Sequence, residues 1–313
     1  MIVYALARLL SLVFQYLPLQ VSYRLVTWLA DVVYLTWTQK KRNMWDNMAH
    51  VLGPGASWKQ VNRLAKQSLH NYFKYLVDFL RFPVLTQEEI QRLVKITGWE
   101  NFDKALEAGR GIIFISLHMG NWDFAAAAMA LRNYKMNVVV DSLKPPKLDA
   151  FVVGARTRMG MKVIPLEKAA RQVFQALRQN EALALLIDRP LTESGVIVRF
   201  FNGFTRVPSV AARLALRTGA RVIPAGLIRL PDNSFQAIVG QHIHFQPTGD
   251  LKGDIQAFTQ RIMNFLEEIV RQHPDQWYMF RRMWLPTPPA EGADEEEPVM
   301  EAPLPTLSPD TGP

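Results

Sequence analysis

A histidine and a carboxylate stand five positions apart where a buried strand gives way to a helix. Residues 111–117 are apolar and rich in β-branched side chains, which is typical of a buried strand. The alanine-rich stretch at 121–132 favours a helix. His118 therefore falls at the carboxyl end of a strand, where α/β sheets gather their chemistry. Asp123, in the first turn of the helix, is within reach of it.

An imidazole beside a carboxylate suits the activation of an alcohol. An alcohol is a poor nucleophile at neutral pH and needs a base within hydrogen-bond distance. A carboxylate on the other ring nitrogen fixes the tautomer and stabilises the imidazolium that forms. We therefore predict that His118 is the general base and Asp123 its partner. Since the chain has six histidines, His-x4-Asp arises easily by chance, and the prediction depends on the strand-to-helix turn.

Ionisable residues follow two further predicted strands. Asp141 ends a valine-rich strand, and Asp188 and Arg189 end a leucine-rich one. Together with His118, they mark an edge of the sheet at which a pocket would form. A structural ion pair between Asp188 and Arg189 is the alternative. Arg156 lies on a helix between these strands, and either faces the pocket or is solvated.

A possible phosphate site lies in the segment 200–229. Gly203 indicates a turn, and Pro208 suits the start of a helix. A helix N-terminus beside Arg206 and Arg213 favours an anionic group such as a phosphate. We therefore include Arg206 among the candidate substrate-binding residues.

Composition excludes several kinds of site. The 313 residues include no Cys, which excludes disulfides and thiolate nucleophiles or metal ligands. No Gly-x-Gly-x-x-Gly, Walker or Gly-x-Ser-x-Gly motif occurs, so nucleotide binding and a serine nucleophile have no motif support. The net charge is +8, and residues 291–313 hold seven acids and no Lys or Arg, which leaves +15 on the rest. Such a body suits anionic lipid, phosphate, an acidic carrier protein or nucleic acid.

The order of apolar patterns predicts an α/β fold with a mixed, mostly parallel sheet flanked by helices. We expect a helical, membrane-associated region at 1–98, an α/β domain at 99–286, and a disordered, acidic, Pro-rich tail at 287–313. Strands are predicted at 111–117, 137–141, 162–165, 182–187, 196–201, 221–228 and 235–241, and helices at 57–82, 100–108, 121–132, 147–160, 168–179, 207–218 and 254–272.

The first 37 residues are strongly apolar but interrupted. No uninterrupted apolar span of the length needed to cross a bilayer occurs. Two amphipathic helices broken at Pro18 fit the pattern, and the Trp and Tyr residues along them are typical of a helix lying in a membrane interface. Lys40, Lys41 and Arg42 follow, where anionic headgroups would lie. The alternative is that both helices only pack on the domain.

Several ordered blocks resemble a known family. They are SLHMGNWD around His118, DSLKPP after the next strand, RMGMKVIPL, IDRP, the long block at 200–229, and HPDQWYMFRRMW near the end. The chain resembles the bacterial lipid A biosynthesis acyltransferases and their relatives, the phosphatidylinositol mannoside acyltransferases, over roughly residues 1–286. Both belong to the glycerolipid acyltransferase superfamily, whose signature is His-x4-Asp/Glu.

The resemblance implies a fold and a reaction. It implies a helix-flanked α/β sheet with N-terminal helices on the cytoplasmic face of the bacterial membrane, held peripherally. His118 would act as base with Asp123, while Asp141, Arg156, Asp188 and Arg189 would line the acceptor or oxyanion side. The donor would be an acyl thioester of coenzyme A or acyl carrier protein and the acceptor a glycolipid, with no cofactor, metal or nucleic acid.

The chain departs from the lipid A enzymes at two points. The acid of the motif is Asp, as in the mannoside enzymes, and Phe280 stands where a His commonly precedes two arginines. Both departures weigh against lipid A as the acceptor. Two other functions stay open: a hydrolase that uses the same His/Asp pair on water, and a basic membrane or nucleic-acid adaptor without turnover.

Overall fold

The structure, a computed structural model, describes residues 2–189 and 195–285. The tail predicted at 287–313 lies outside these residues. A central sheet of seven strands has the order β1-β9-β8-β2-β5-β3-β4. The strands are β1 (Val94–Thr97), β2 (Ile112–Ser116), β3 (Met136–Val140), β4 (Lys162–Pro165), β5 (Ala182–Leu186), β8 (Arg221–Arg229) and β9 (Phe235–Val239), and a separate hairpin pairs β6 (Val196–Phe200) with β7 (Gly203–Val207).

The sheet is mixed and mostly parallel, as predicted. Strands β8, β2, β5, β3 and β4 run parallel to one another, while β9 is antiparallel to β8 and parallel to β1. Parallel neighbours bring their carboxyl ends to one edge. The two reversed strands lie together on one side, so the carboxyl ends of β2 and β5 remain side by side in the middle of that edge.

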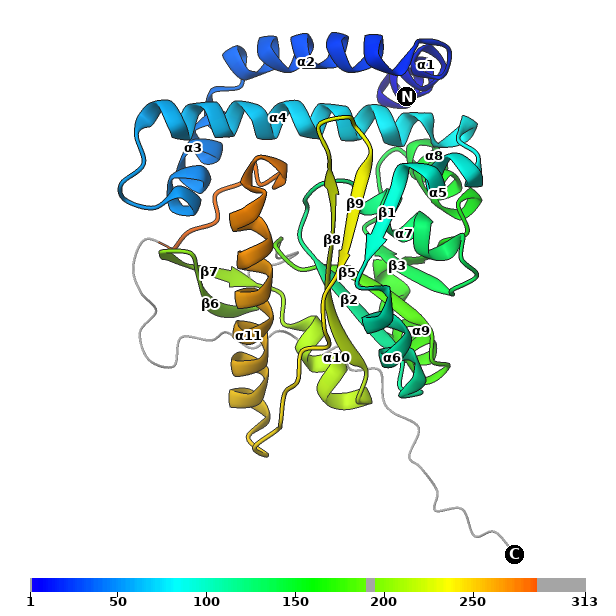
Figure 1. The fold of residues 1–313 in the computed structure, drawn as a ribbon, viewed down its shortest axis with the longest axis vertical. Coiled ribbons are helices and arrows are strands. Elements are labelled where there is room, and N and C mark those ends of the chain that lie inside the picture. Colours follow the sequence, from blue (N-terminus) through cyan, green and yellow to red (C-terminus); the bar gives the residue numbers. More distant parts are fainter. Residues whose placement is uncertain (1, 190–194, 286–313) are drawn as a thin grey trace, which may run out of the picture.

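Helices cover both faces of the sheet (Figure 1). The helices after the first strand are α6 (Trp99–Glu107), α7 (Trp122–Ala130), α8 (Pro146–Arg158), α9 (Ala169–Arg178), α10 (Val210–Thr218) and α11 (Leu251–Gln272). Alternation along β2 supplies both cores: Ile113 and Ile115 pack with residues of α9, α10 and α11, and Ile112 and Phe114 with residues of α6, α7 and α8. A strand buried on both faces explains its unbroken apolar run.

The N-terminal helices form a layer across one end of the sheet, drawn in blue and cyan in Figure 1. Helix α4 reaches the carboxyl edge, where Tyr75 and Asp78 contact the segment after β2. Ser57 opens α4 with a capping box to Gln60. The layer comprises α1 (Ile2–Tyr16), α2 (Leu19–Thr36), α3 (Thr38–Leu52), α4 (Trp58–Arg81) and the short α5 (Gln87–Leu93).

Pro18 separates α1 from α2, as predicted, whereas α3 was not expected. The basic run at 40–42, interpreted as a headgroup contact, lies inside α3. Its low hydrophobicity hides a buried stripe that includes Met44 and Met48. Within the described residues, no helix is both long and apolar enough to cross a bilayer. The domain boundary proposed at residue 98 stays a prediction.

Candidate active site

The register of the sheet brings His118 and Asp188 together. Ser116 pairs with Leu186 at the ends of β2 and β5. Each of the two ionisable residues lies two positions beyond its strand end, so they emerge side by side at the carboxyl edge. His118 and Asp188 are 70 residues apart in the chain.

His118 and Asp188 are joined by two hydrogen bonds. The ring Nδ1 of His118 lies 2.6 Å from Asp188 Oδ1, and the backbone N–H of His118 donates to Oδ2 at 2.9 Å. Trp277 Nε1 also donates to Oδ2, at 3.1 Å. The Asp188 carboxylate is fully buried, whereas the His118 side chain keeps 18% of its surface exposed. The imidazole is therefore fixed on one side and open on the other.

Electrostatics set the tautomer of the ring. Burial alone would raise the pKa of Asp188, but the charge and hydrogen bonds of His118, together with Arg189, lower the pKa to about 2. An ionised carboxylate only accepts hydrogen bonds, so Nδ1 must carry the hydrogen. Nε2 then keeps its lone pair in the neutral ring, which is the form a general base requires.

Asp123 forms no hydrogen bond or ion pair with His118, so the pairing predicted from the motif is wrong. Arg156 Nε donates to Asp123 Oδ1 at 2.7 Å and its Nη2 to Oδ2 at 3.3 Å, while the Tyr75 hydroxyl donates to Oδ2 at 2.8 Å. Asp123 is 3% exposed. It lies in the first turn of α7, so its side chain is directed to α4 and α8 rather than back to the strand end.

Arg156 keeps its charge beside Asp123. Burial disfavours the charge on Arg156, but Asp123 outweighs it and raises the pKa of Arg156. Burial, reinforced by Asp123, raises the pKa of Tyr75 well above its usual range, so its hydroxyl stays a donor. A buried ion pair of this geometry fixes α7 against α4 and α8. Arg156, predicted to line the pocket, is engaged in this pair.

Backbone contacts hold the loop that carries His118. Gly120 has φ +57°, and a side chain there would overlap the Leu227 carbonyl oxygen. Its N–H donates to Gln276 O at 2.9 Å. The Asn121 side chain caps α7 by accepting from Phe124 N at 3.0 Å. The His118 carbonyl accepts from Tyr278 N at 2.8 Å, so the loop is tied to the end of the chain.

The remaining predicted residues divide into two groups. Arg189 and Arg206 line a cavity of about 130 Å³ next to Asp188, with Arg281 and Arg282 from the end of the domain. Arg189 donates to the Tyr278 carbonyl at 2.7 Å. Asp141 is exposed after β3, with no side-chain hydrogen bond or ion pair to any described residue. The structure therefore gathers Asp188, Arg189 and Arg206, but not Asp141.

An apolar cavity is lined by Ser116, at the end of β2, and by Trp122. It measures about 70 Å³ and lies between α7 and the sheet. Trp122, which lines it, meets the His118 ring edge-on with 5.2 Å between centroids. Small side chains make the space, among them Ala125, Ala128 and Ala184. Among residues 2–189 and 195–285, no cluster of three or more His, Asp or Glu side chains is arranged to hold a metal ion.

Comparison with known proteins shows the family to which the chain belongs. The family described as bacterial lipid A biosynthesis acyltransferase matches residues 1–286. The chain belongs to this family. The acyltransferase is 32% identical over 247 residues to the phosphatidylinositol mannoside acyltransferase of Mycobacterium tuberculosis, which covers 76% of this chain and 75% of that protein. It is 30% identical over 245 residues to the protein of the same name from Mycolicibacterium smegmatis, covering 76% and 78%.

Proposed function

We propose that this acyltransferase moves a fatty acyl group from a thioester of coenzyme A or acyl carrier protein to a hydroxyl of a glycolipid or phospholipid, with His118 as general base. The observation that carries the proposal is the His118–Asp188 pair, with its ring nitrogen Nδ1 bound and the rest of the ring partly exposed. Family membership supports an acyl donor and a lipid acceptor as substrates.

The proposed reaction proceeds without an acyl-enzyme. Nε2 of His118 takes the hydroxyl proton as the acceptor oxygen forms a bond to the thioester carbonyl carbon. The carbonyl π electrons move to its oxygen and return when the carbon–sulfur bond breaks. The imidazolium, stabilised by the Asp188 charge, returns the proton to the departing thiolate. A positioned base of this kind contributes about a hundred- to ten-thousand-fold.

Arg189 is our candidate donor to the developing oxyanion. Its Nε is buried and has no hydrogen-bond partner among the described residues, while its Nη2 is fixed on the Tyr278 carbonyl. A fixed cationic donor beside the base would act in a largely water-excluded site, where such stabilisation is worth roughly 3–4 kcal/mol. Arg189 directly follows Asp188, so one segment of chain would supply both the partner of the base and the donor to the oxyanion.

The apolar cavity suits the acyl chain of the donor, and the arginine-lined cavity suits an anionic group of the acceptor. The apolar one offers small side chains to an acyl chain, and each buried methylene contributes roughly 0.8 kcal/mol. The other is lined by Arg189, Arg206, Arg281 and Arg282. Guanidinium groups bind phosphate through paired hydrogen bonds. The relatives act, by their names, on phosphatidylinositol mannosides, and we propose a related anionic glycolipid as the acceptor.

The first two helices supply a surface for the membrane. Large apolar side chains are exposed along both helices. Trp28, on α2, is 67% exposed. An amphipathic helix with such a face lies in the plane of a lipid interface, and we propose peripheral attachment at the cytoplasmic face. The face includes Leu6, Leu9, Leu12, Leu25, Trp28 and Leu29.

Acyl transfer is tested with purified protein, a long-chain acyl thioester and a mannosylated phosphoinositide. We expect wild type to acylate the acceptor and His118→Ala to lose at least about a hundredfold of the rate while it retains a cooperative unfolding transition. His244→Ala, at an exposed histidine, is the control. Turnover by His118→Ala at the wild-type rate contradicts the mechanism. Thioester loss that does not need the acceptor supports the hydrolase instead.

Membrane attachment is tested by substitution rather than deletion. Removing the first 37 residues would also uncover the buried charges that Tyr23 of α2 contacts. We therefore replace Leu25 and Trp28 with Gln and expect co-sedimentation with anionic vesicles to fall, with activity on detergent-dispersed substrates retained. Unchanged sedimentation would show that α2 does not lie on the bilayer.

A further inference from the structure

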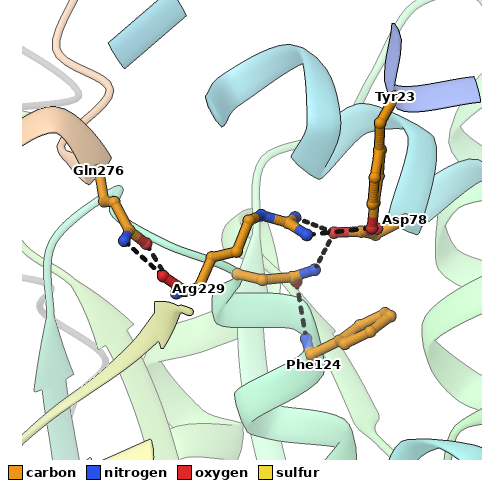
Figure 2. Close-up of polar contacts among 6 residues, drawn as sticks. Tyr23, Asp78, Phe124, Arg229 and Gln276 are labelled. Carbon is orange, nitrogen blue, oxygen red and sulfur yellow. Dashed lines mark hydrogen bonds and ion pairs between the residues drawn. The ribbon is translucent and has the colours of Figure 1, made fainter. Parts of the chain in front are cut away.

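A buried polar network lies between helix α2 and the loop that carries His118. Its centre is Asp78 of α4, which is 3% exposed. The Tyr23 hydroxyl donates to Asp78 Oδ1 at 2.5 Å, and Asn121 Nδ2 donates to Oδ2 at 3.0 Å. Arg229 forms an ion pair with Asp78 through Nη2 and donates from Nη1 to the Tyr23 oxygen at 3.0 Å. Tyr23 belongs to α2, Asp78 to α4 and Arg229 to β8, and Figure 2 shows their side chains pointing toward one another.

Asn121 is the point at which the network meets the catalytic loop. Its amide nitrogen reaches Asp78 while its oxygen caps α7 at Phe124 N (Figure 2). Its backbone N–H donates to Leu227 O at 3.2 Å. Asn121 thus fixes both the start of α7 and the end of the turn that begins at His118, three residues earlier.

A second path links the network to the other side of the loop. Arg229 and Gln276 exchange two hydrogen bonds, from Arg229 N to Gln276 Oε1 and from Gln276 Nε2 to Arg229 O, each 2.8 Å long. The Gln276 carbonyl in turn accepts from Gly120 N. The turn at His118 is therefore held on one side by Asn121, which binds Asp78, and on the other by Gln276, which binds Arg229.

Removing these charged groups from water costs free energy, so a contribution to stability alone does not explain the network. Arg229 is 7% exposed, and its Nε has no partner among the described residues. Burial would lower the pKa of Arg229, but Asp78 outweighs it. Replacing a buried ion pair by apolar residues is often neutral or stabilising, so retention of one favours a role in fixing geometry. The geometry fixed here is that of the base relative to the N-terminal layer.

We propose that Tyr23, Asp78, Asn121 and Arg229 are positioning residues for acyl transfer, which hold the His118 loop in register with helix α2. The inference rests on the proposed function, since the position of His118 matters only if His118 takes the proton. A displacement of about 1 Å at a reacting group costs about a hundredfold in rate. Tyr23 touches none of the reacting groups, so its contribution reaches the reaction through Asp78 and Asn121.

The experiment compares two tyrosines of the same helix. Tyr23→Phe removes one hydroxyl from the network. Tyr34→Phe, the matched control, removes a hydroxyl that donates to Asn62 Oδ1 of α4 at 2.8 Å, away from the loop. We expect kcat of Tyr23→Phe to fall about tenfold or more, with KM for the donor within twofold of wild type. Tyr34→Phe should keep the wild-type kcat, and both variants should retain a cooperative unfolding transition.

Asn121→Ser provides an independent variant. Serine preserves the helix cap but lacks the amide donor to Asp78. We expect the same pattern of lowered kcat and nearly unchanged KM. If Tyr23→Phe and Asn121→Ser keep wild-type kcat, or lose no more than Tyr34→Phe, the network is structural only and the inference is wrong.

A readout without substrate separates this inference from the proposed function. If the wild-type protein transfers no acyl group, the proposed function fails. The His118 ring resonances in an NMR titration then decide the positioning claim, since they report the His118–Asp188 contact directly. A shifted titration in Tyr23→Phe, absent from Tyr34→Phe, supports the positioning role, and identical titrations in all three proteins overturn it.

Discussion

Two buried carboxylates within the same active-site region have different partners. Asp123 faces a guanidinium and a tyrosine hydroxyl, which neutralise and enclose it. Asp188 faces an imidazole whose far side remains partly exposed. Both are nearly inaccessible to solvent. Asp123 and Asp188 therefore differ in their partners and not in their burial. A permanently charged guanidinium partner fixes one helix against another, whereas an imidazole partner gives a group able to accept and return a proton.

The difference arises from where each carboxylate sits on its element. Asp188 follows the strand next to β2, so the register of the sheet aligns it with His118. Asp123 follows His118 in sequence but lies on the first turn of α7, whose N-cap is Asn121. Proximity along the chain brings Asp123 near His118 without directing its carboxylate at the imidazole.

The largest expected effect is on turnover when Asp188 is replaced. The amide nitrogen of Asp188→Asn would donate to His118 Nδ1 and force the hydrogen onto Nε2, which abolishes the base. A comparable exchange in a serine-protease triad lowers kcat about ten-thousand-fold, and we expect a loss of about a thousandfold or more. Initial rates with saturating substrates check this. A loss below tenfold would mean that Asp188 does not set the tautomer.

Replacement of Asp123 should act mainly on stability. Asp123→Asn leaves Arg156 buried without its countercharge, which costs about 3–5 kcal/mol in unfolding free energy. The double variant with Arg156→Met should recover much of it, because both charges are then gone. Urea denaturation measures the cycle. Arg271→Gln, at an exposed pair with Glu267, is the control and should change stability by less than about 1 kcal/mol. If the losses of unfolding free energy in the two single variants add up in the double variant, Asp123 and Arg156 do not stabilise each other.

The smallest effect is in the pH profile. With a pKa of about 2, Asp188 stays ionised at any pH at which the protein is assayed. The carboxylate of Asp188 then takes up no proton as the pH falls, so the acid side of log kcat/KM should have a slope no steeper than one. A slope of two in wild type would show that a second group titrates with the base and that the carboxylate is not permanently charged.

The sequence predicts most of the sheet, since β-branched runs such as that of β2 are typical of buried strands. Strand β1 was missed because Lys95 interrupts its apolar residues, and β7 because Arg206 and the turn at Gly203 obscure it. His118 and Asp188 were both recognised as strand-end residues. Their pairing was missed because the neighbour of β2 is β5, and strand order does not follow from local patterns.

The contacts made by the N-terminal layer could not be predicted from the sequence either. Tyr75 and Asp78 fall on the expected helix α4, yet nothing in their spacing shows that one meets Asp123 and the other Arg229. Trp277 lies in the block HPDQWYMFRRMW, and nothing in that block shows that its indole donates to Asp188. Such side chains are identified by the packing of distant elements, which a periodic pattern does not encode.

The central claim is that Asp188 holds His118 with a hydrogen on Nδ1 and a free lone pair on Nε2. Nitrogen NMR of the protein labelled at histidine, with the His118 signals assigned from the spectrum of His118→Gln, reads the tautomer directly at neutral pH. The account predicts a protonated Nδ1, directed to Asp188, and an unprotonated Nε2 in the neutral ring. A proton on Nε2 with a bare Nδ1 would contradict it.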